Sequence, residues 1–293
     1  MRCGVRGAHR AGFLLVVLAV AVCAIVATAQ AAPATTNPLR YVALGDSYSA
    51  ASGVLPPDPT APPECLRSSR NYPHVIAANI DAQLTDVTCG AAETSDFFSS
   101  QYQNVPPQLD AVNQRAQLVT MTIGGNDNGV FIDAIVDCGS AGLSTAGQGS
   151  PCKDRYGSSF ADTIRSKTYP ALVKALGAVE QKAPRARVAI LGYPWILPPT
   201  EGCYPQMPVA TGDVPYLHHI QWVLNDAIRR AAEATGVTYV NLNGVATGHD
   251  ACKPIGVRWV EPVVFGTNPV VVHPNALGER NMAAKAMAVL DLR

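Results

Sequence analysis

Short runs of β-branched and other apolar residues recur along the chain, and longer segments of different character separate them. The runs lie at 39–44, 85–89, 116–124, 186–192 and 237–242. Runs of this length and composition, bounded by polar or small residues, are typical of buried strands. We therefore expect five β-strands.

The segments between these runs carry apolar residues at helical spacing. Helices are predicted over 72–81, 129–137, 159–183, 215–235 and 274–292. Pro170 should kink the third of them, because proline lacks the N–H that a helix needs. Strands that alternate with helices form a parallel sheet covered on both faces. We expect an α/β fold: a single doubly wound α/β/α domain with a five-stranded parallel sheet.

Four stretches fit neither pattern and are rich in Pro and Gly. They cover 53–64, 138–157, 193–213 and 243–270, and each contains or adjoins a cysteine. Long irregular segments are usually either functional or floppy. Cross-links at the cysteines would make them ordered loops, and we expect these loops to frame a site.

The first 31 residues have the pattern of a secretory signal peptide. Three arginines precede an apolar segment from Gly12 to about Thr28, and Ala29-Gln30-Ala31 has the form of a signal-peptidase site. An uncleaved membrane anchor is the alternative. We expect a secreted, extracellular protein, with association with the cell envelope left open, whose functional domain covers residues 32–293.

Charge and length bound the class of protein further. Without residues 1–31 the chain keeps 262 residues with 19 basic and 22 acidic side chains, a net charge of −3. That length suffices for one α/β domain with a full core. Nothing in this balance indicates binding to nucleic acid, which requires clustered positive charge.

The domain contains six cysteines, an even number that indicates disulfides in an oxidising compartment. Six cysteines allow 15 pairings, and the sequence does not choose among them rigorously. We predict the sequential pairing Cys65–Cys89, Cys138–Cys152 and Cys203–Cys252. No Cys-x-x-Cys or His-x-x-x-His spacing accompanies these residues, so we predict no metal site.

Residues suited to acyl transfer follow the first three predicted strands. Ser47 follows the first, Gly90 the second, and Asn126 the third. Ligands of open parallel sheets bind beyond the carboxyl ends of the strands, so these residues should share one crevice. A serine could attack an ester carbonyl there, while the Gly90 N–H and the Asn126 amide stabilise the developing oxyanion.

Each of these residues also has a structural interpretation. Asp46 or Ser47 could cap a helix, and Gly90 could serve a tight turn. Asp127 could cap the helix that follows the third strand. The convergence of three strand ends on one crevice favours the catalytic interpretation over these.

A general base is needed, and His273 is the best candidate among the six histidines. It precedes Pro274, a residue favoured at the first helical position, so its ring would be held at a helix entrance. His249, in a loop, stays possible. His74 and the adjacent pair His218 and His219 lie within predicted helices, and a structural interpretation of His273 as a helix cap remains open.

The motifs resemble, in order and context, the four blocks of the SGNH or GDSL hydrolases. They are Gly45-Asp46-Ser47, Gly90, Gly124-x-Asn126-Asp127 and His273-Pro274, and they span residues 41–275. The stretch YVALGDSYSA, the signal and the cysteines are most similar to secreted actinomycete lipases and esterases of that family. The resemblance implies a flavodoxin-like fold, no cofactor, Ser47 as nucleophile, His273 as base, and an oxyanion hole of Ser47 N–H, Gly90 N–H and Asn126 Nδ2.

One block departs from the family pattern. Most relatives carry Asp three residues before the histidine, where this chain has Val270. The main-chain carbonyl of Val270 is expected to orient the histidine, as the resemblance implies for some secreted relatives. Asp250 and Glu261 are the conceivable sources of a carboxylate.

We expect the substrate to be a small-molecule or lipid ester with a fatty-acyl chain. We also expect the protein to contact a lipid surface transiently. The acyl chain should lie against apolar loop residues: Val54, Leu55, Tyr193, Trp195, Ile196, Leu197, Tyr204, Trp259, Val263, Val264 and Phe265. A carbohydrate O-acetyl esterase on the same fold and a non-catalytic secreted binding protein are the alternatives. We expect the protein to act as a monomer.

Overall fold

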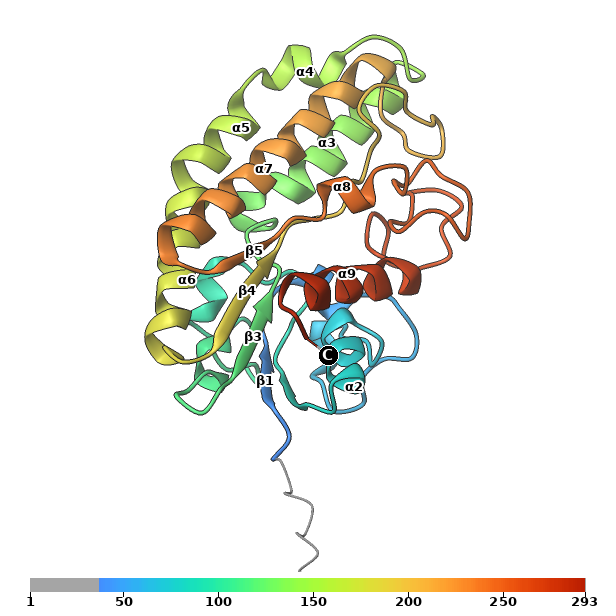
Figure 1. Cartoon of the computed structure of the whole chain (residues 1–293). Helices are drawn as coiled ribbons and strands as arrows, with labels where there is room; N and C mark the ends of the chain where they lie inside the picture. Colours follow the sequence, from blue (N-terminus) through green and yellow to red (C-terminus); the bar gives the residue numbers. More distant parts are fainter. Residues whose placement is uncertain (1–36, 293) are drawn as a thin grey trace, which may run out of the picture. The chain divides into compact units, whose positions relative to one another are not determined.

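The apolar runs of the sequence form the strands of a parallel sheet (Figure 1). This computed structural model describes residues 37–292, so the predicted signal peptide, residues 1–31, lies outside it. Within the described residues the strands are β1 (Arg40–Ala43), β2 (Gln83–Asp86), β3 (Leu118–Met121), β4 (Arg187–Leu191) and β5 (Thr238–Val240). They run in the order β2-β1-β3-β4-β5, and every neighbouring pair is parallel, as predicted.

Each predicted helical segment forms a helix with shifted ends, and short helices at 47–50, 151–156 and 243–246 were not predicted. The helices are α1 (Ser47–Ala50), α2 (Tyr72–Asn79), α3 (Val130–Ser144), α4 (Pro151–Tyr156), α5 (Ser159–Thr163), α6 (Tyr169–Lys182), α7 (Val214–Thr235), α8 (Asn243–Ala246) and α9 (Ala276–Val289). Where the sequence predicts a kink at Pro170, a π-helical turn, Ile164–Thr168, lies between α5 and α6. In that turn the backbone hydrogen bonds span five residues, so that Tyr169 N–H bonds to the Ile164 carbonyl.

Alternate residues of each strand face opposite helical layers, as the period of a strand requires. Val42 of β1 and Val119 of β3 belong to the core that α3, α5, α6 and α7 cover. Tyr41 and Leu118 belong to the other core, against α2 and α9. Figure 1 shows these two groups of helices on opposite sides of the strands. The described residues from Pro38 onward thus form a single α/β/α domain.

The strand order places a topological switch point between β1 and β3. From β1 the chain crosses to β2 on one side, and from β2 it returns to β3 on the other. At such a point the loops that follow neighbouring strands leave in opposite directions, and ligands of open α/β sheets bind there. The segments that carry Ser47 and Asn126 follow β1 and β3 directly.

The three cysteine pairs of the described chain are those predicted: Cys65–Cys89, Cys138–Cys152 and Cys203–Cys252. One predicted loop, 138–157, is mostly helical instead, because α3 continues to Ser144 and α4 follows. Within residues 37–292 no helix is long and apolar enough to cross a membrane.

Candidate active site

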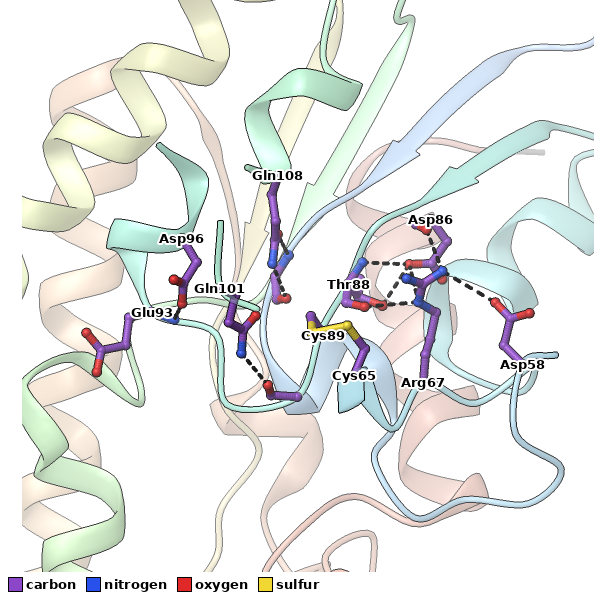
Figure 2. Close-up of a disulfide and its surroundings, with 12 residues drawn as sticks. Asp58, Cys65, Arg67, Asp86, Thr88, Cys89, Glu93, Asp96, Gln101 and Gln108 are labelled. Atoms are coloured by element: carbon purple, nitrogen blue, oxygen red, sulfur yellow. Dashed lines mark hydrogen bonds and ion pairs between the residues drawn. A yellow bond between two sulfur atoms is a disulfide. The ribbon is translucent and has the colours of Figure 1, made fainter. Parts of the chain in front are cut away.

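The turn after β1 holds Ser47 as the first residue of α1. Its neighbour Asp46 caps that helix by accepting from the Tyr48 N–H at 3.0 Å. Gly45 has a φ of +123°, and a Cβ there would lie 2.3 Å from the Thr122 carbonyl oxygen. The Gln108 side chain holds both peptide groups of Gly45, with its Oε1 accepting from N at 2.6 Å and its Nε2 donating to O at 3.0 Å (Figure 2). The serine is therefore presented from a tightly fixed turn.

Ser47 and His273 meet although 226 residues separate them in sequence. Ser47 Oγ lies 2.7 Å from His273 Nε2. Both side chains are largely buried, with 8% and 9% of their surface exposed. The pair has the separation and the partial access that a nucleophile and its base require.

The other ring nitrogen of the histidine fixes the tautomer. His273 Nδ1 lies 2.8 Å from the carbonyl oxygen of Val271. A carbonyl only accepts, so Nδ1 carries the proton and Nε2 is free to accept from the Ser47 hydroxyl. The prediction that Val270 supplies this carbonyl is wrong by one residue, because Val272 adopts a φ of +60° and turns the Val271 carbonyl back towards the ring.

Neither carboxylate proposed from sequence contacts the histidine. Asp250 accepts from the Cys252 N–H at 3.0 Å. Glu261 is paired with buried Arg258 at 2.7 Å. Its main chain instead supports the base, since Glu261 N–H donates to the His273 carbonyl at 2.9 Å and Glu261 O accepts from Val272 N–H at 2.9 Å. The pair in this structure is a Ser–His dyad with a main-chain acceptor.

Burial lowers the pKa of His273 below its ordinary value, and the hydrogen bond to the Val271 carbonyl opposes that shift. The lowered pKa keeps the ring neutral at neutral pH. A neutral ring is the form that accepts a proton from a serine.

Two donors at the strand ends are available to an oxyanion. Asn126 Nδ2 donates to the Ala92 carbonyl at 3.0 Å, which uses one of its two hydrogens. The N–H of Ser47, at the first position of α1, has no acceptor in the described part of the chain. Asp127 does not cap a helix but accepts from Thr94 N–H at 2.9 Å and from its hydroxyl at 2.7 Å, joining the loops that follow β2 and β3.

Gly90 does not offer the free N–H that the sequence predicts. Its N–H donates to the Cys65 carbonyl at 2.8 Å. The Cys65–Cys89 disulfide brings that carbonyl to the neighbouring residue, and Gln101 Nε2 donates to the Gly90 carbonyl at 2.7 Å (Figure 2). Because a Cβ at Gly90 would lie 3.1 Å from the Cys65 oxygen, this glycine serves close packing of the loop.

Two tyrosines hold the turn, the base and the loop after β3 together. Tyr193 donates its hydroxyl hydrogen to Asp46 and accepts from Gly125 N–H at 2.9 Å. Its ring packs edge-on against Tyr48, 5.0 Å between centroids. Burial raises the pKa of Asp46 to about 6, although the hydrogen bonds from Tyr193 and Thr122 lower it. The Asp46 carboxylate is thus a structural acceptor beside the nucleophile.

An apolar cavity of about 90 Å³ lies next to this cluster. Gly125 and Tyr193 line it on the side of the loop after β3, and Val272 lines it beside the base. Two helices supply a large part of its wall, with Val130, Phe131, Ala134 and Ile135 on α3 and Leu217, Ile220 and Leu224 on α7, and loop residues supply most of the rest. The helical spacing of these apolar residues was the signal that could have identified them.

The loop residues predicted to bind the acyl chain lie in different places: some line the cavity, some are buried elsewhere and some are exposed. Tyr193, Ile196, Leu197 and Val263 line the cavity. Trp195 and Trp259 are buried in a separate cluster with Ala246. Four side chains lie at the surface away from the cavity wall: Leu55, Tyr204, Val264 and Phe265. Val54 is buried and does not line the cavity.

The other described histidines have separate partners. His74 bonds to Asn71 at 2.7 Å and lies 3.4 Å from Asp86. His249 bonds to the Val257 carbonyl and stacks on Trp259, while His218 stacks on Trp195. Among residues 37–292 no group of three or more His, Cys, Asp or Glu side chains is placed to hold a metal ion.

Comparison with known proteins relates this site to a family. Residues 43–280 match the GDSL-like Lipase/Acylhydrolase family. The chain is 62% identical over 269 residues to Lipase 2 of Streptomyces coelicolor, which covers 91% of both chains. The crystal structure of a phospholipase A1 from Streptomyces albidoflavus superposes with a TM-score of 0.68 at 28% identity, covering 87% of this chain and 99% of that one. An extracellular lipase from Streptomyces rimosus also gives 0.68, at 27% identity over 86% and 98%.

Proposed function

Because this chain belongs to the GDSL-like lipase and acylhydrolase family of carboxylic ester hydrolases, we propose that it cleaves fatty-acyl esters through an acyl-enzyme on Ser47. The observation that carries the proposal is the 2.7 Å contact between Ser47 Oγ and His273 Nε2. This contact joins a nucleophile to a base whose second nitrogen, Nδ1, is hydrogen-bonded to the Val271 carbonyl.

In the first step Ser47 Oγ attacks the ester carbonyl carbon while His273 Nε2 takes the hydroxyl proton. The carbonyl oxygen becomes an oxyanion, which the Ser47 N–H and the second hydrogen of the Asn126 amide stabilise. The tetrahedral intermediate then breaks the bond to the alcohol oxygen, which receives the proton from His273. The products of this step are the free alcohol and an ester of Ser47.

Water completes the cycle. His273 Nε2 accepts a proton as the water oxygen attacks the acyl-enzyme, and the same donors bind the second oxyanion. When the bond to Ser47 breaks, His273 returns the proton to Oγ and the fatty acid leaves. Throughout, the Val271 carbonyl accepts from Nδ1–H and favours the positively charged ring.

The cavity beside the dyad supports a fatty-acyl substrate. Its wall is almost entirely aliphatic or aromatic, and it adjoins Gly125, the residue before the oxyanion donor Asn126. An acyl chain that enters it gains about 0.8 kcal/mol for each CH₂ removed from water. A short acetyl group would leave most of this wall unused.

The same proposal includes secretion. The signal-like segment at residues 1–31 and the disulfides of the described chain both suit an exported protein. Mass measurement of the mature protein is expected to give a start near Ala32.

The test is a panel of nitrophenyl esters from acetate to decanoate with purified wild type, Ser47→Ala and His273→Ala. We expect kcat/KM to rise from acetate to at least hexanoate, and both variants to lose nearly all activity while their circular dichroism is unchanged. Substantial turnover by folded Ser47→Ala would overturn the mechanism. A preference for acetate over every longer ester would overturn the fatty-acyl assignment.

A further inference from the structure

The loop between Glu261 and the base exposes large apolar side chains at its tip. We call residues 262–267 the rim turn. Phe265 in this turn is 76% exposed, the largest value for any large apolar side chain of residues 37–292, and Val264 beside it is 39% exposed. Packing in the core does not account for these two side chains, because neither Val264 nor Phe265 belongs to a buried apolar cluster.

Buried polar groups hold the rim turn in one conformation. Glu261 Oε2 accepts from Thr267 N–H at 2.7 Å, and Arg258 Nη2 donates to the Phe265 carbonyl at 3.2 Å. Arg258 and Glu261 are themselves an ion pair with 3% and 1% side-chain exposure. Phe265 has a φ of +62°, a left-handed conformation that non-glycine residues rarely adopt. The fold therefore keeps the phenylalanine projected from a fixed turn.

Two short segments of this loop border the acyl cavity: one lies in the rim turn and the other lies next to the base. Val263, the residue before Val264, lines the cavity. Val272 lines it as well, and its neighbour Val271, whose carbonyl holds His273, is 40% exposed. Two segments thus each pass from a cavity wall to an exposed apolar residue within one or two positions.

Charge is absent from this part of the chain. The eleven residues 262–272 contain no Asp, Glu, Lys, Arg or His. A surface of this kind does not require a charged partner, and its exposed apolar groups favour insertion into an apolar layer. Because Val263 of the rim turn also lines the cavity, an apolar layer at this surface would lie next to the proposed acyl site.

We propose that Val264, Phe265 and Val271 form an anchor that inserts into the surface of a neutral lipid aggregate and delivers acyl chains to the cavity. The proposal rests on the fatty-acyl esterase function above. It predicts that the anchor governs the hydrolysis of aggregated esters and leaves the hydrolysis of dissolved esters unchanged.

The experiment compares Phe265→Gly with wild type. Glycine suits the left-handed turn, so the side chain is removed without strain in the backbone. In a Ser47→Ala background, the fraction that sediments with phosphatidylcholine vesicles should fall about tenfold, and 0.5 M salt should not release the bound protein. In the active enzyme, hydrolysis of phosphatidylcholine vesicles or a tributyrin emulsion should fall about tenfold, while kcat/KM for dissolved nitrophenyl butyrate stays within twofold.

Two matched variants control this comparison. Phe265→Trp keeps an apolar group at the tip and should retain binding. Phe98→Ser alters an aromatic side chain of 41% exposure that lies against Lys174 of α6, and it should bind like wild type. Circular dichroism and thermal unfolding establish that each variant is folded.

The outcomes separate the anchor from the proposed function. If wild type fails to cleave dissolved butyrate, the function itself is wrong. If wild type cleaves it but Phe265→Gly binds and hydrolyses vesicles as well as wild type, the anchor is overturned alone. An equal loss on dissolved and aggregated esters, or binding that depends on anionic lipid and low salt, would also overturn it.

Discussion

The hydroxyl of Tyr48 donates to the main-chain carbonyl of Val272 across 2.7 Å, which ties the residue after the nucleophile to the residue before the base. The Tyr48 ring also lies 5.1 Å from the His273 ring, centre to centre. One side chain therefore links the turn that carries Ser47 to the loop that carries His273. Among the described residues a main-chain carbonyl, not a carboxylate, bonds to the Nδ1 of His273, so this support takes part of the orienting role.

Replacement of Tyr48 by Phe tests that support. The variant leaves the Val272 carbonyl unpaired, which costs about 1–3 kcal/mol of stability, and small displacements of a base can lower turnover by up to about 100-fold. We expect kcat/KM to fall at least tenfold. Tyr41→Phe is the matched control, because its buried hydroxyl bonds to Thr120 of β3 rather than to the histidine loop. Equal activity losses in the two variants would show that Tyr48 acts only through stability.

The pH dependence of kcat/KM should have an acidic limb below the ordinary histidine pKa of about 6.5. Burial lowers the pKa of His273, so the ring stays neutral and able to accept a proton until the pH falls further than for an exposed histidine. Kinetics from pH 4 to 9, with the His273 ring followed by NMR, measure this. A ring midpoint above pH 7 would contradict the arrangement. Asp46, with a pKa of about 6, titrates in the same window, and the NMR signal distinguishes the two groups.

Glu261→Gln should destabilise the protein, and Asp250→Asn should not affect activity. Burial raises the pKa of Glu261, but hydrogen bonds from Arg258, Thr267 and Asn275 together hold it below its ordinary value. Removing one partner of a buried ion pair costs about 3–5 kcal/mol. Because folding lowers the pKa of Glu261, its ion pair stabilises the fold above the pKa of the unfolded state. This stabilisation is lost as the pH falls through the pKa of the folded state. The difference in free energy of unfolding between wild type and Glu261→Gln should therefore shrink in acid.

Urea unfolding of wild type, Glu261→Gln and Asp250→Asn at pH 7 and pH 4 measures the difference in free energy of unfolding. Asp250→Asn, whose carboxylate caps the Cys252 N–H and does not contact the base, should keep most of the wild-type kcat/KM. A loss of about 1,000-fold or more in Asp250→Asn would identify it as the missing acid of the dyad.

Ala134→Phe should shorten the preferred acyl chain. Ala134 faces the cavity from α3, and a phenyl ring there would occupy space that a chain beyond butyrate needs. We expect the ratio of kcat/KM for octanoate to that for acetate to fall about tenfold or more, in line with about 0.8 kcal/mol for each CH₂ excluded. Ile132→Phe, on the exposed side of the same helix, is the control. An unchanged ratio in Ala134→Phe would place the acyl chain elsewhere.

The sequence predicted the sheet and the helical layers from its strand and helix patterns. It predicted the Ser47–His273 contact because Ser47 follows the first strand and His273 precedes Pro274 at a helix entrance, as in the family that the motifs resemble. It missed the end of α3 because Gly139 and Gly142 indicate a helix break. In the structure these glycines admit a neighbouring loop, since a Cβ at Gly142 would lie 2.3 Å from the Pro208 oxygen. Close packing between distant segments left no local signal.

The errors at the site have the same origin. The shift from Val270 to Val271 depends on a left-handed valine at position 272, a conformation that its residue type disfavours. The engagement of the Gly90 N–H depends on which carbonyl the Cys65–Cys89 bridge brings near. The apolar wall was expected in loops alone, whereas loops and the helices α3 and α7 share it. Each of these features arises from tertiary contacts that a sequence pattern does not contain.

The central claim is that His273 activates Ser47 as a nucleophile, and covalent labelling tests it most directly. Wild type, His273→Ala and Ser47→Ala are incubated with a fluorophosphonate, and the products are followed by intact mass and peptide mapping. We expect wild type to gain one phosphonyl group on Ser47, His273→Ala to react at least 100-fold more slowly, and Ser47→Ala to stay unmodified. A folded wild type that does not react, or a Ser47→Ala variant that is labelled as fast as wild type, would contradict the account.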